Sequence, residues 1–350
     1  MTMWFCMICF RGWWNWKRQI IGSVAADGQS QGKERNMKVL MQMDLTEELI
    51  EEIRQVAEEV EVVCVDSDAA ALEVMPEIEV VCGHISQEMF ARRKKLKWMQ
   101  SWGAGVDGVL HPELVESDVV LCSAKGWVGV HLAEHAMALL LGLTRGIHTA
   151  VRYPDWDRRW AIRAASWELI EQTMGIVGLG GTGRELAKRA SAFGMRIIAV
   201  DPEEVEVPEE VEACWGMDQF HALLEQADVV AVCAPLTAET EGLFDQEAFA
   251  RMRSHALLIN VTRGWIVDEQ ALLTALADGQ IGGAGLDVVP QEPLPEDHPL
   301  WRMDNVLITP HTAGGSPNRD SRCVALFCDN LRRYLAGEAL VSVIDKRKGY

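Results

Sequence analysis

Three apolar runs near the end of the sequence are each followed or interrupted by an ionisable residue. Arg263 follows ALLINVT, Asp287 lies within GLDVV, and His311 follows VLITP. Such runs are typical of buried parallel strands, and ligands of open parallel sheets bind outside the carboxyl ends of the strands. We therefore expect the three side chains to converge on one crevice. Glu292 follows in the loop PQEPLP, whose prolines stiffen it.

A cation, an imidazole and a carboxylate in one crevice suit the reduction of a 2-oxo acid. Arg263 would bind the substrate carboxylate with paired donors. His311 would donate a proton to the carbonyl oxygen as hydride arrives, and Glu292 would keep the imidazole protonated near neutral pH. Each residue alone has a plainer explanation as a cap, a surface charge or a loop residue, but the combination favours chemistry.

A glycine-rich turn upstream predicts the nucleotide that would supply the hydride. In GIVGLGGTG, the residues Gly178, Gly180 and Gly183 have the spacing G-x-G-x-x-G, directly after an apolar strand and at the start of a helix. Backbone N–H groups at such a helix start can hold a pyrophosphate. The next strand ends in Asp201, whose carboxylate would accept hydrogen bonds from the adenosine ribose and repel a 2′-phosphate. The pattern therefore predicts NAD rather than NADP.

Strand and helix patterns alternate from Met37 onwards, which predicts parallel sheets with crossover helices. One series has the strands KVLMQM, VEVVCV, EVVCGH, KWMQSW and VVLCSA and ends near residue 125. A long helical segment, GVHLAEHAMALLLGLTRGIHTAVR, leads to a second series that starts at MGIVGLG, and a last helix is stopped by Gly337. The chain therefore reads as two α/β domains joined by long helices.

Composition excludes several classes of partner. A net charge of −19 argues against nucleic acid and against an anionic membrane surface, because both require a basic patch. No apolar run is long enough to span a bilayer. Cysteines inside apolar runs, such as Cys64, Cys82, Cys122 and Cys233, suggest buried thiols and a cytoplasmic protein. Residues 1–36 are net basic and rich in tryptophan, and we expect them to lie outside the fold; their Cys6 and Cys9 form a C-x-x-C without a second pair.

The stretch HLAEH, residues 131–135, matches the H-x-x-E-H pattern of inverted zinc peptidases. Its two histidines lie four apart on one helix face, but a zinc site needs a further ligand, and no suitable second motif stands out. We expect packing between domains to be the role of His131 and His135, and we expect no metal.

Several blocks together resemble the D-isomer-specific 2-hydroxyacid dehydrogenase family. They are NVTRGWIVDEQAL, GAGLDVVPQEPLP, NVLITPHTAGGS and, for the cofactor, MGIVGLGGTGRELAKRASAFGMRIIAVDP; LKWMQSWGAGVD looks like the family's substrate loop. The resemblance covers about residues 37–350. It implies an α/β fold of two doubly wound parallel-sheet domains, a Rossmann NAD-binding domain (139–316) and a flavodoxin-like, discontinuous substrate domain (37–138 and 317–350), separated by a cleft.

The resemblance also assigns roles. His311 would be the proton donor, Glu292 its partner and Arg263 the carboxylate ligand, with a small 2-oxo or 2-hydroxy acid as substrate. The loop residues Gly103, Ala104 and Gly105 would hold the carboxylate from the other domain, and a homodimer with the long helix near its two-fold contact is implied. The residues that would bind NAD are Gly178, Gly180, Gly181, Thr182, Gly183, Asp201, Pro235, Thr240, Val261, Thr262, Arg263, Asp287, His311, Ala313 and Gly314.

Three alternatives stay open beside the dehydrogenase. They are a zinc-dependent hydrolase using HLAEH, a non-catalytic NAD-sensing protein on the same fold, and a formate dehydrogenase, whose branch usually carries another residue at Glu292. Glyoxylate, hydroxypyruvate or a bulkier oxo acid all fit. The cluster ARRKKLK could indicate a phosphorylated substrate such as phosphoglycerate, although a solvated helix face explains it more simply. Trp102 and Trp127 could shape a pocket or belong to the core.

Overall fold

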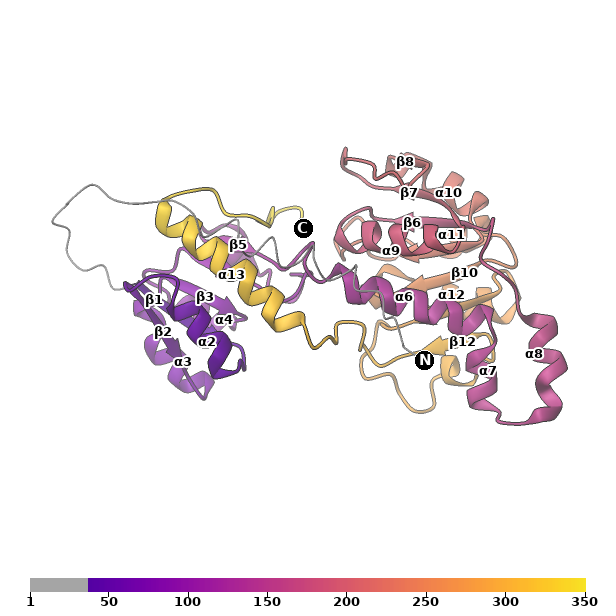
Figure 1. The fold of residues 1–350 in the computed structure, drawn as a ribbon, viewed down its shortest axis with the longest axis horizontal. Helices are drawn as coiled ribbons and strands as arrows, with labels where there is room; N and C mark the ends of the chain where they lie inside the picture. Colours follow the sequence, from indigo (N-terminus) through magenta and orange to yellow (C-terminus); the bar gives the residue numbers. More distant parts are fainter. Residues whose placement is uncertain (1–36) are drawn as a thin grey trace, which may run out of the picture. The chain divides into compact units, whose positions relative to one another are not determined.

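A computed structural model describes residues 37–350, and Cys6 and Cys9 lie outside the described residues. It contains two parallel sheets. The first has the order β2-β1-β3-β4-β5, and the second has the order β12-β11-β10-β9-β6-β7-β8. These are the flavodoxin-like order and, with one strand added, the Rossmann order. The predicted fold class is therefore confirmed (Figure 1).

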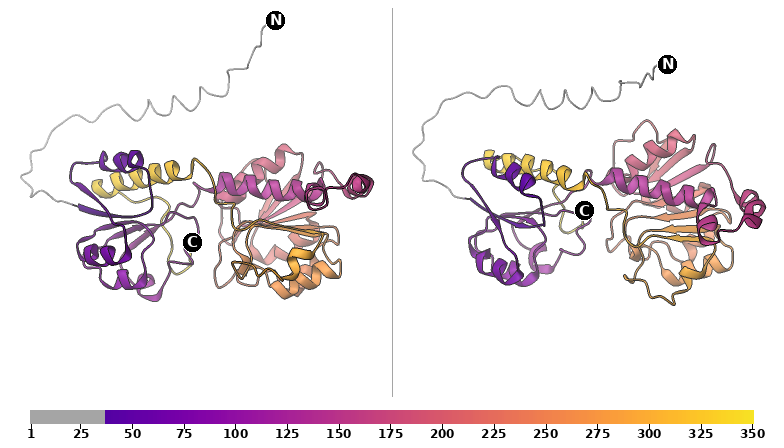
Figure 2. Two further views of the ribbon diagram at one scale, coloured as in Figure 1. Left: turned by 90° about the horizontal axis from the view of Figure 1, so that it is seen from below. Right: turned by 60° about the horizontal axis from the view of Figure 1, so that its bottom comes forward.

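The first sheet is covered by helices on both faces. Its strands are β1 (Met37–Gln42), β2 (Val60–Cys64), β3 (Val80–Gly83), β4 (Trp98–Gln100) and β5 (Val120–Cys122). Helices α2 (Glu47–Arg54) and α13 (Arg319–Ala336) pack on one face, and α3 (Asp68–Val74), α4 (Gln87–Ala91) and α5 (Pro112–Val115) pack on the other (Figure 2). Val39 faces the first layer and Leu40 the second, as the two-residue period of a strand requires. Gly337 ends α13 in the left-handed conformation, as predicted.

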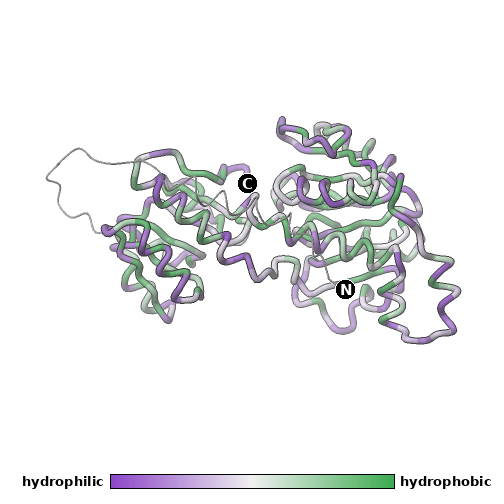
Figure 3. The backbone as a smooth tube through the Cα atoms, viewed as in Figure 1, coloured by the Kyte–Doolittle hydropathy of each residue, from purple (hydrophilic) through white to green (hydrophobic). Residues whose placement is uncertain are grey.

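The second sheet is buried on both faces. Its strands are β6 (Thr173–Val177), β7 (Arg196–Val200), β8 (Ala213–Trp215), β9 (Val229–Val232), β10 (Leu257–Asn260), β11 (Gly283–Leu286) and β12 (Val306–Ile308). Helices α6 (Gly129–Thr144) and α9 (Gly181–Ala192) cover one face; α10 (Phe220–Gln226), α11 (Gln246–Arg251) and α12 (Glu269–Ala277) cover the other. Apolar residues accordingly dominate the strands of this sheet, while polar residues gather on loops and outer helix faces (Figure 3).

Short 3-10 helices complete the described elements: Met75–Glu77, Trp156–Arg158, Met217–Gln219, Gly264–Ile266 and Pro299–Arg302. The edge strand β8 was not predicted, because its three residues give too short a pattern to recognise.

The expected long helix after residue 129 is two helices. α6 ends at Thr144, and α7 (Ile147–Arg152) begins after Gly146, which has a φ of 65°. Glycine adopts this left-handed conformation without steric cost, so the chain turns there and continues through α8 (Arg159–Ala165). Within the described part of the chain, none of the helices combines the length and apolar character needed to cross a membrane.

The thiols only partly follow the prediction. Cys82 and Cys122 are buried, and Cys233 is partly buried, but Cys64 is exposed. Cys64 is the last residue of β2, which lies at the edge of the first sheet. Burial raises the pKa of the Cys122 thiol to about 12, so this residue behaves as a small apolar side chain.

Candidate functional site

His311 and Glu292 form a hydrogen-bonded pair after the last two strands of the second sheet. His311 Nδ1 lies 2.6 Å from Glu292 Oε2, and Glu292 Oε1 accepts a hydrogen bond of 3.1 Å from the Val289 N–H. The His311 backbone has a φ of 53° and donates to the carbonyl oxygen of Asp287. The imidazole is 50% exposed. With Nδ1 committed to Glu292, Nε2 is the nitrogen that faces an incoming molecule.

Asp287 lies beneath the loop that carries His311. Its Oδ1 accepts hydrogen bonds from Thr309 Oγ1 (2.6 Å) and the Thr312 N–H (2.8 Å), and its Oδ2 accepts from the Ala313 N–H (2.9 Å). Burial alone would raise the pKa of Asp287, but these bonds and His135 hold it well below the ordinary value. The carboxylate is therefore charged, and it fixes the loop from Thr309 to Ala313.

His135 joins this network from α6. Its Nε2 lies 2.7 Å from Thr309 Oγ1 and 3.3 Å from Asp287 Oδ1. His131, one turn earlier, is buried, and both its ring nitrogens lack a hydrogen-bond partner among residues 37–350. Burial, together with the charges of Arg322 and Arg319, lowers the pKa of His131. The two histidines of HLAEH therefore lie in different environments: His135 contacts Thr309 and Asp287, whereas His131 is buried.

Metal ligation finds no support in this region. Across residues 37–350, no group of three or more His, Cys, Asp or Glu side chains is arranged to hold a metal ion. His135 is instead a structural partner of the loop that carries His311. The sequence indicated a packing role for it but not its specific partners, Thr309 and Asp287.

Arg263 extends from the turn after β10 towards the WGAGVD loop. Its Nε donates to Asp107 Oδ1 at 3.0 Å, and its Nη1 donates to the carbonyl oxygen of Thr262. Asn260 orients this turn, because its Oδ1 accepts from the Thr262 N–H and its Nδ2 donates to the Arg263 carbonyl oxygen. A methyl group on Gly105 would lie 2.1 Å from Arg263 Nη2, so any larger residue would displace the guanidinium from its present position.

The structure therefore brings together two predicted components of the carboxylate site, Arg263 and the loop containing Gly103, Ala104 and Gly105. Asp107, which sequence reasoning did not select, forms an ion pair with the Arg263 guanidinium. Trp102 is buried, and its Nε1 donates to Asp320 Oδ1 at 2.9 Å, so it anchors the loop to α13. Trp127 is partly buried.

The glycine turn connects β6 to α9. Gly178 has a φ of 94°, and Gly180 is the N-cap of α9. A methyl group on Gly183 would lie 2.2 Å from the Gly178 carbonyl oxygen, so the helix packs tightly on the strand. Because the N-cap residue is glycine, no side chain caps the first N–H groups of α9, and such helix starts bind anions. The turn follows β6, beside which the strand order reverses.

Asp201 directly follows β7 and is held by backbone donors. The Leu179 N–H donates to its Oδ2 at 2.8 Å, and the Glu203 N–H donates to its Oδ1 at 3.0 Å. Each carboxylate oxygen has two lone pairs, so both can accept a second bond from a ribose hydroxyl. The carboxylate is thus both oriented and still available.

The remaining predicted cofactor residues occupy loops after neighbouring strands. Thr240 Oγ1 donates to the Pro235 carbonyl oxygen at 2.7 Å, which shapes the loop after β9. Val261 and Ala313 are buried, and Thr262 and Gly314 are partly buried. All of them follow β9, β10 or β12.

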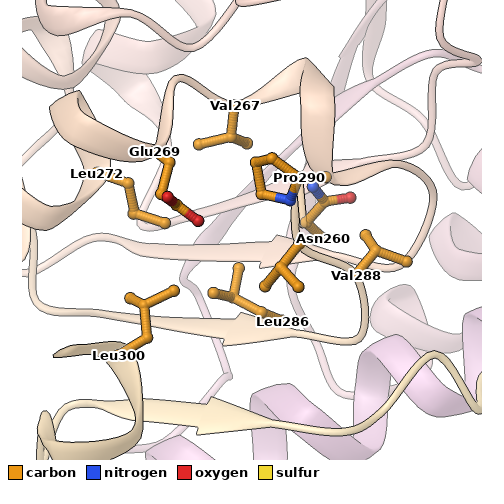
Figure 4. Close-up of a pocket in the computed structure, with 10 residues that line it drawn as sticks. Asn260, Val267, Glu269, Leu272, Leu286, Val288, Pro290 and Leu300 are labelled. Carbon is orange, nitrogen blue, oxygen red and sulfur yellow. The ribbon is translucent and has the colours of Figure 1, made fainter. Parts of the chain in front are cut away.

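A small cavity of about 10 Å³ lies beneath this region, near the turn after β10 (Figure 4). It is lined by Asn260, Glu269, Leu286 and Pro290 among others, and Glu269 Oε1 lacks a hydrogen-bond partner in the described part of the chain. The volume suits a single water molecule rather than a substrate. The cluster ARRKKLK lies beyond the end of α4, mostly exposed, with Arg93 stacked on Phe90, which fits a solvated surface.

Comparison with known proteins identifies the family. Residues 137–313 match the family model described as D-isomer specific 2-hydroxyacid dehydrogenase, NAD binding domain. The chain belongs to the D-isomer-specific 2-hydroxyacid dehydrogenase family. Glyoxylate reductase of Korarchaeum cryptofilum is 33% identical over 275 residues, which cover 77% of this chain and 82% of that protein.

Two further comparisons extend the finding. D-3-phosphoglycerate dehydrogenase of Methanocaldococcus jannaschii is 31% identical over 88% of this chain, which spans only 59% of that relative's length. The crystal structure of a D-isomer specific 2-hydroxyacid dehydrogenase from Xanthobacter autotrophicus, in complex with NADPH and MES, has a TM-score of 0.74. It is 28% identical, and the match covers 90% of this chain and 100% of that one. The family therefore supports oxidoreduction of a hydroxy acid with a nicotinamide nucleotide, in agreement with the site geometry.

Proposed function

We propose that the protein reduces a small 2-oxo acid to the D-2-hydroxy acid with NADH, and catalyses the reverse reaction with NAD. The carrying observation is the His311–Glu292 pair, with Nε2 of a half-exposed imidazole open beside the carboxyl ends of the strands. The family supports the reaction class, while the residues and the substrate are our assignment.

His311 and Glu292 would manage the proton. In the reduction, hydride reaches the carbonyl carbon and the Nε2–H bond of His311 donates its proton to the carbonyl oxygen, forming the hydroxyl group. Glu292 accepts a hydrogen bond from Nδ1–H, which fixes the tautomer and stabilises the imidazolium before transfer. The bound nicotinamide would supply the hydride.

Arg263 and the WGAGVD loop would orient the substrate carboxylate. The guanidinium already contacts a carboxylate, that of Asp107, and a substrate carboxylate is chemically equivalent to it. The close approach of Gly105 places loop backbone beside the same group. The substrate would be a small 2-oxo acid, with glyoxylate and hydroxypyruvate as first candidates and a bulkier oxo acid as the third.

NAD is the proposed cofactor because Asp201, at the end of β7, would accept hydrogen bonds from the adenosine ribose and would repel a 2′-phosphate. The family relative from Xanthobacter was crystallised with NADPH, so the discrimination needs direct measurement. We assign the cofactor domain to residues 139–316 and the substrate domain to 37–138 and 317–350. The thiol burial described above is in keeping with a cytoplasmic location, which stays a prediction.

We further propose a homodimer. Along α7, α8 and the turn between them, large apolar side chains are unusually exposed: Ile147, Val151, Trp156 and Trp160, with Trp156 at 84%. Apolar patches of this kind mark association surfaces. These helices directly continue α6, which the resemblance placed near the two-fold contact. Sedimentation equilibrium of the full chain would measure the state.

The first experiment follows NADH absorbance with a panel of 2-oxo acids, with NADPH and a chelator as parallel arms. His311→Gln keeps a polar side chain but removes the proton donor, so kcat should fall about 10²- to 10⁴-fold. NADH affinity should change far less than kcat, because the pyrophosphate and ribose contacts stay in place. Retention of wild-type kcat in His311→Gln would refute the assignment. NADH binding without turnover of any acid would instead support a sensor, and loss of activity with chelator would support a metal.

A further inference from the structure

Residues 343–350 run from the first sheet to the loops that follow β7 and β9 of the second. Val343 pairs with Cys122 beside β5, and the Ile344 N–H donates to the Leu121 carbonyl oxygen at 2.8 Å. Lys346 Nζ donates to three carbonyl oxygens at the end of α5 and the loop after it, those of Leu114, Ser117 and Val119. This segment is therefore firmly fixed to the first sheet.

Two of its side chains then reach the second sheet. Lys348 Nζ lies 2.5 Å from Glu203 Oε1, and the Tyr350 hydroxyl donates to the same oxygen at 3.0 Å. A methyl group on Gly349 would lie 3.7 Å from Thr237 Cγ2, in the loop after β9. The segment thus reaches the loop after β7 and the loop after β9, both at the carboxyl ends of the strands.

Glu203 is directly coupled to the carboxylate assigned to the ribose. Its backbone N–H donates to Asp201 Oδ1 at 3.0 Å, so the two carboxylates belong to the same tight turn and each acts in the electrostatic field of the other. Hydrogen bonds from Lys348 and Tyr350 lower the pKa of Glu203, so Glu203 is charged. Burial, the bond to Glu203 and the charge of Asp201 raise the pKa of Tyr350, so the hydroxyl that donates to Glu203 is neutral.

We propose that Lys348 and Tyr350 belong to the cofactor site as positioning residues, and that the Lys348–Glu203 pair sets how strongly the site rejects the 2′-phosphate of NADP(H). This inference rests on the cofactor part of the proposed function and deepens it. Residues attached to the first sheet then complete the ribose end of a site built on the second.

The charges of Lys348, Glu203 and Asp201 determine in which direction each substitution should change the affinity for NADPH relative to NADH. With Lys348 present, the charge of Glu203 is offset and Asp201 alone opposes the phosphate. Removal of Lys348 leaves two neighbouring carboxylates, so NADPH should bind less well relative to NADH. Removal of the Glu203 charge leaves an unpaired ammonium group, so NADPH should bind better relative to NADH.

Lys348→Met and Glu203→Gln break the same ion pair but change the local charge in opposite directions. An electrostatic effect should therefore reverse its sign between them, whereas a purely structural effect should not. Lys348→Met should raise the ratio of the NADPH and NADH dissociation constants about threefold to tenfold, and Glu203→Gln should lower it by a similar factor. Because both side chains are about half exposed, the shifts should shrink at high ionic strength. Tyr350→Phe should weaken both nucleotides alike.

The measurement is fluorescence titration of the full chain with NADH and with NADPH, at low and high salt. Arg347→Met is the matched control, since it makes the same charge change one residue away, where the partner is Glu116. In Arg347→Met, the ratio of the NADPH and NADH dissociation constants should equal that of the wild type. Ratios that move in the same direction in Lys348→Met and Glu203→Gln, or that do not move, would overturn the proposal.

The titration needs no 2-oxo acid, so the two proposals fail separately. A wild-type protein that binds nucleotide but reduces no acid would refute the proposed reaction and leave the ratio test decisive. Opposite shifts in the two variants would then still support the role of Lys348. A wild-type protein that binds neither nucleotide would refute both proposals.

Discussion

The loop that carries His311 and the turn that carries Arg263 are held in contrasting ways. Asp287 is 2% exposed and accepts hydrogen bonds from two backbone N–H groups and a threonine hydroxyl, and its Oδ1 lies 3.3 Å from His135 Nε2. The guanidinium of Arg263 instead contacts Asp107 with both side chains about 30% exposed. One arrangement is a buried network that nothing in solution replaces. The other is an ion pair that a dissolved carboxylate can displace.

This difference matches what each group is proposed to do. A proton donor gains from a fixed position, because transfer requires a close and well-aligned approach to the carbonyl oxygen. A carboxylate-binding arginine must change partners in every turnover, so a strong internal bond would oppose substrate binding. Mutations in the buried network should therefore affect stability and kcat together, and mutations in the exposed pair should affect KM.

Asp287→Asn should have the largest effect of the changes that test this contrast. The amide cannot satisfy the N–H groups of Thr312 and Ala313 as the carboxylate does, and the buried network loses its charge. The free energy of unfolding should fall by about 3 kcal/mol, as for a broken buried pair, and kcat should fall as the His311 loop loosens. Urea unfolding and steady-state kinetics measure both.

Acid sharpens the same test. The pKa of Asp287 lies below its unfolded value, so its contribution to stability is complete above about pH 4 and is lost as pH falls further. Below pH 4 the difference in the free energy of unfolding between the wild type and Asp287→Asn should therefore become smaller. Asp304→Asn is the control, since Asp304 is 69% exposed beside Arg152 and should change little. A constant gap down to pH 3 would contradict the charged network.

Arg263→Lys should have the next largest effect, confined to substrate binding. Lysine keeps the charge but cannot present two parallel donors to a carboxylate. The KM for the 2-oxo acid should rise about tenfold to a hundredfold, on the scale of one charge-assisted hydrogen bond, while NADH affinity should change far less. A lower kcat with unchanged KM would place Arg263 outside the carboxylate site.

The sequence was sufficient to predict the strands and the candidate catalytic side chains, but not the residues that form hydrogen bonds and ion pairs with those side chains. Apolar runs and turn residues are local signals, so eleven of the strands within residues 37–350 were recognisable, and in that range only the short edge strand β8 was missed. Asn260, His135 and Asp107 were not assigned their contacts, because each meets a residue distant in the chain or a turn whose geometry depends on packing. Asp107 stood within the quoted WGAGVD loop, and its position beside an anion-binding backbone was the available signal.

Asp107→Asn should give the smallest effect, and in the opposite direction. The amide keeps the shape of the side chain but releases Arg263 from a competing carboxylate. The pair is partly exposed and worth no more than about 1 kcal/mol, so the KM for the 2-oxo acid should fall by up to about fivefold with little change in kcat. Asp107→Asn in an Arg263→Lys background should give a smaller gain, because the fork that both carboxylates compete for is gone. A rise in KM on Asp107→Asn would mean that Asp107 positions Arg263 for the substrate rather than competing with it, and the contrast between the two regions would fail at this residue.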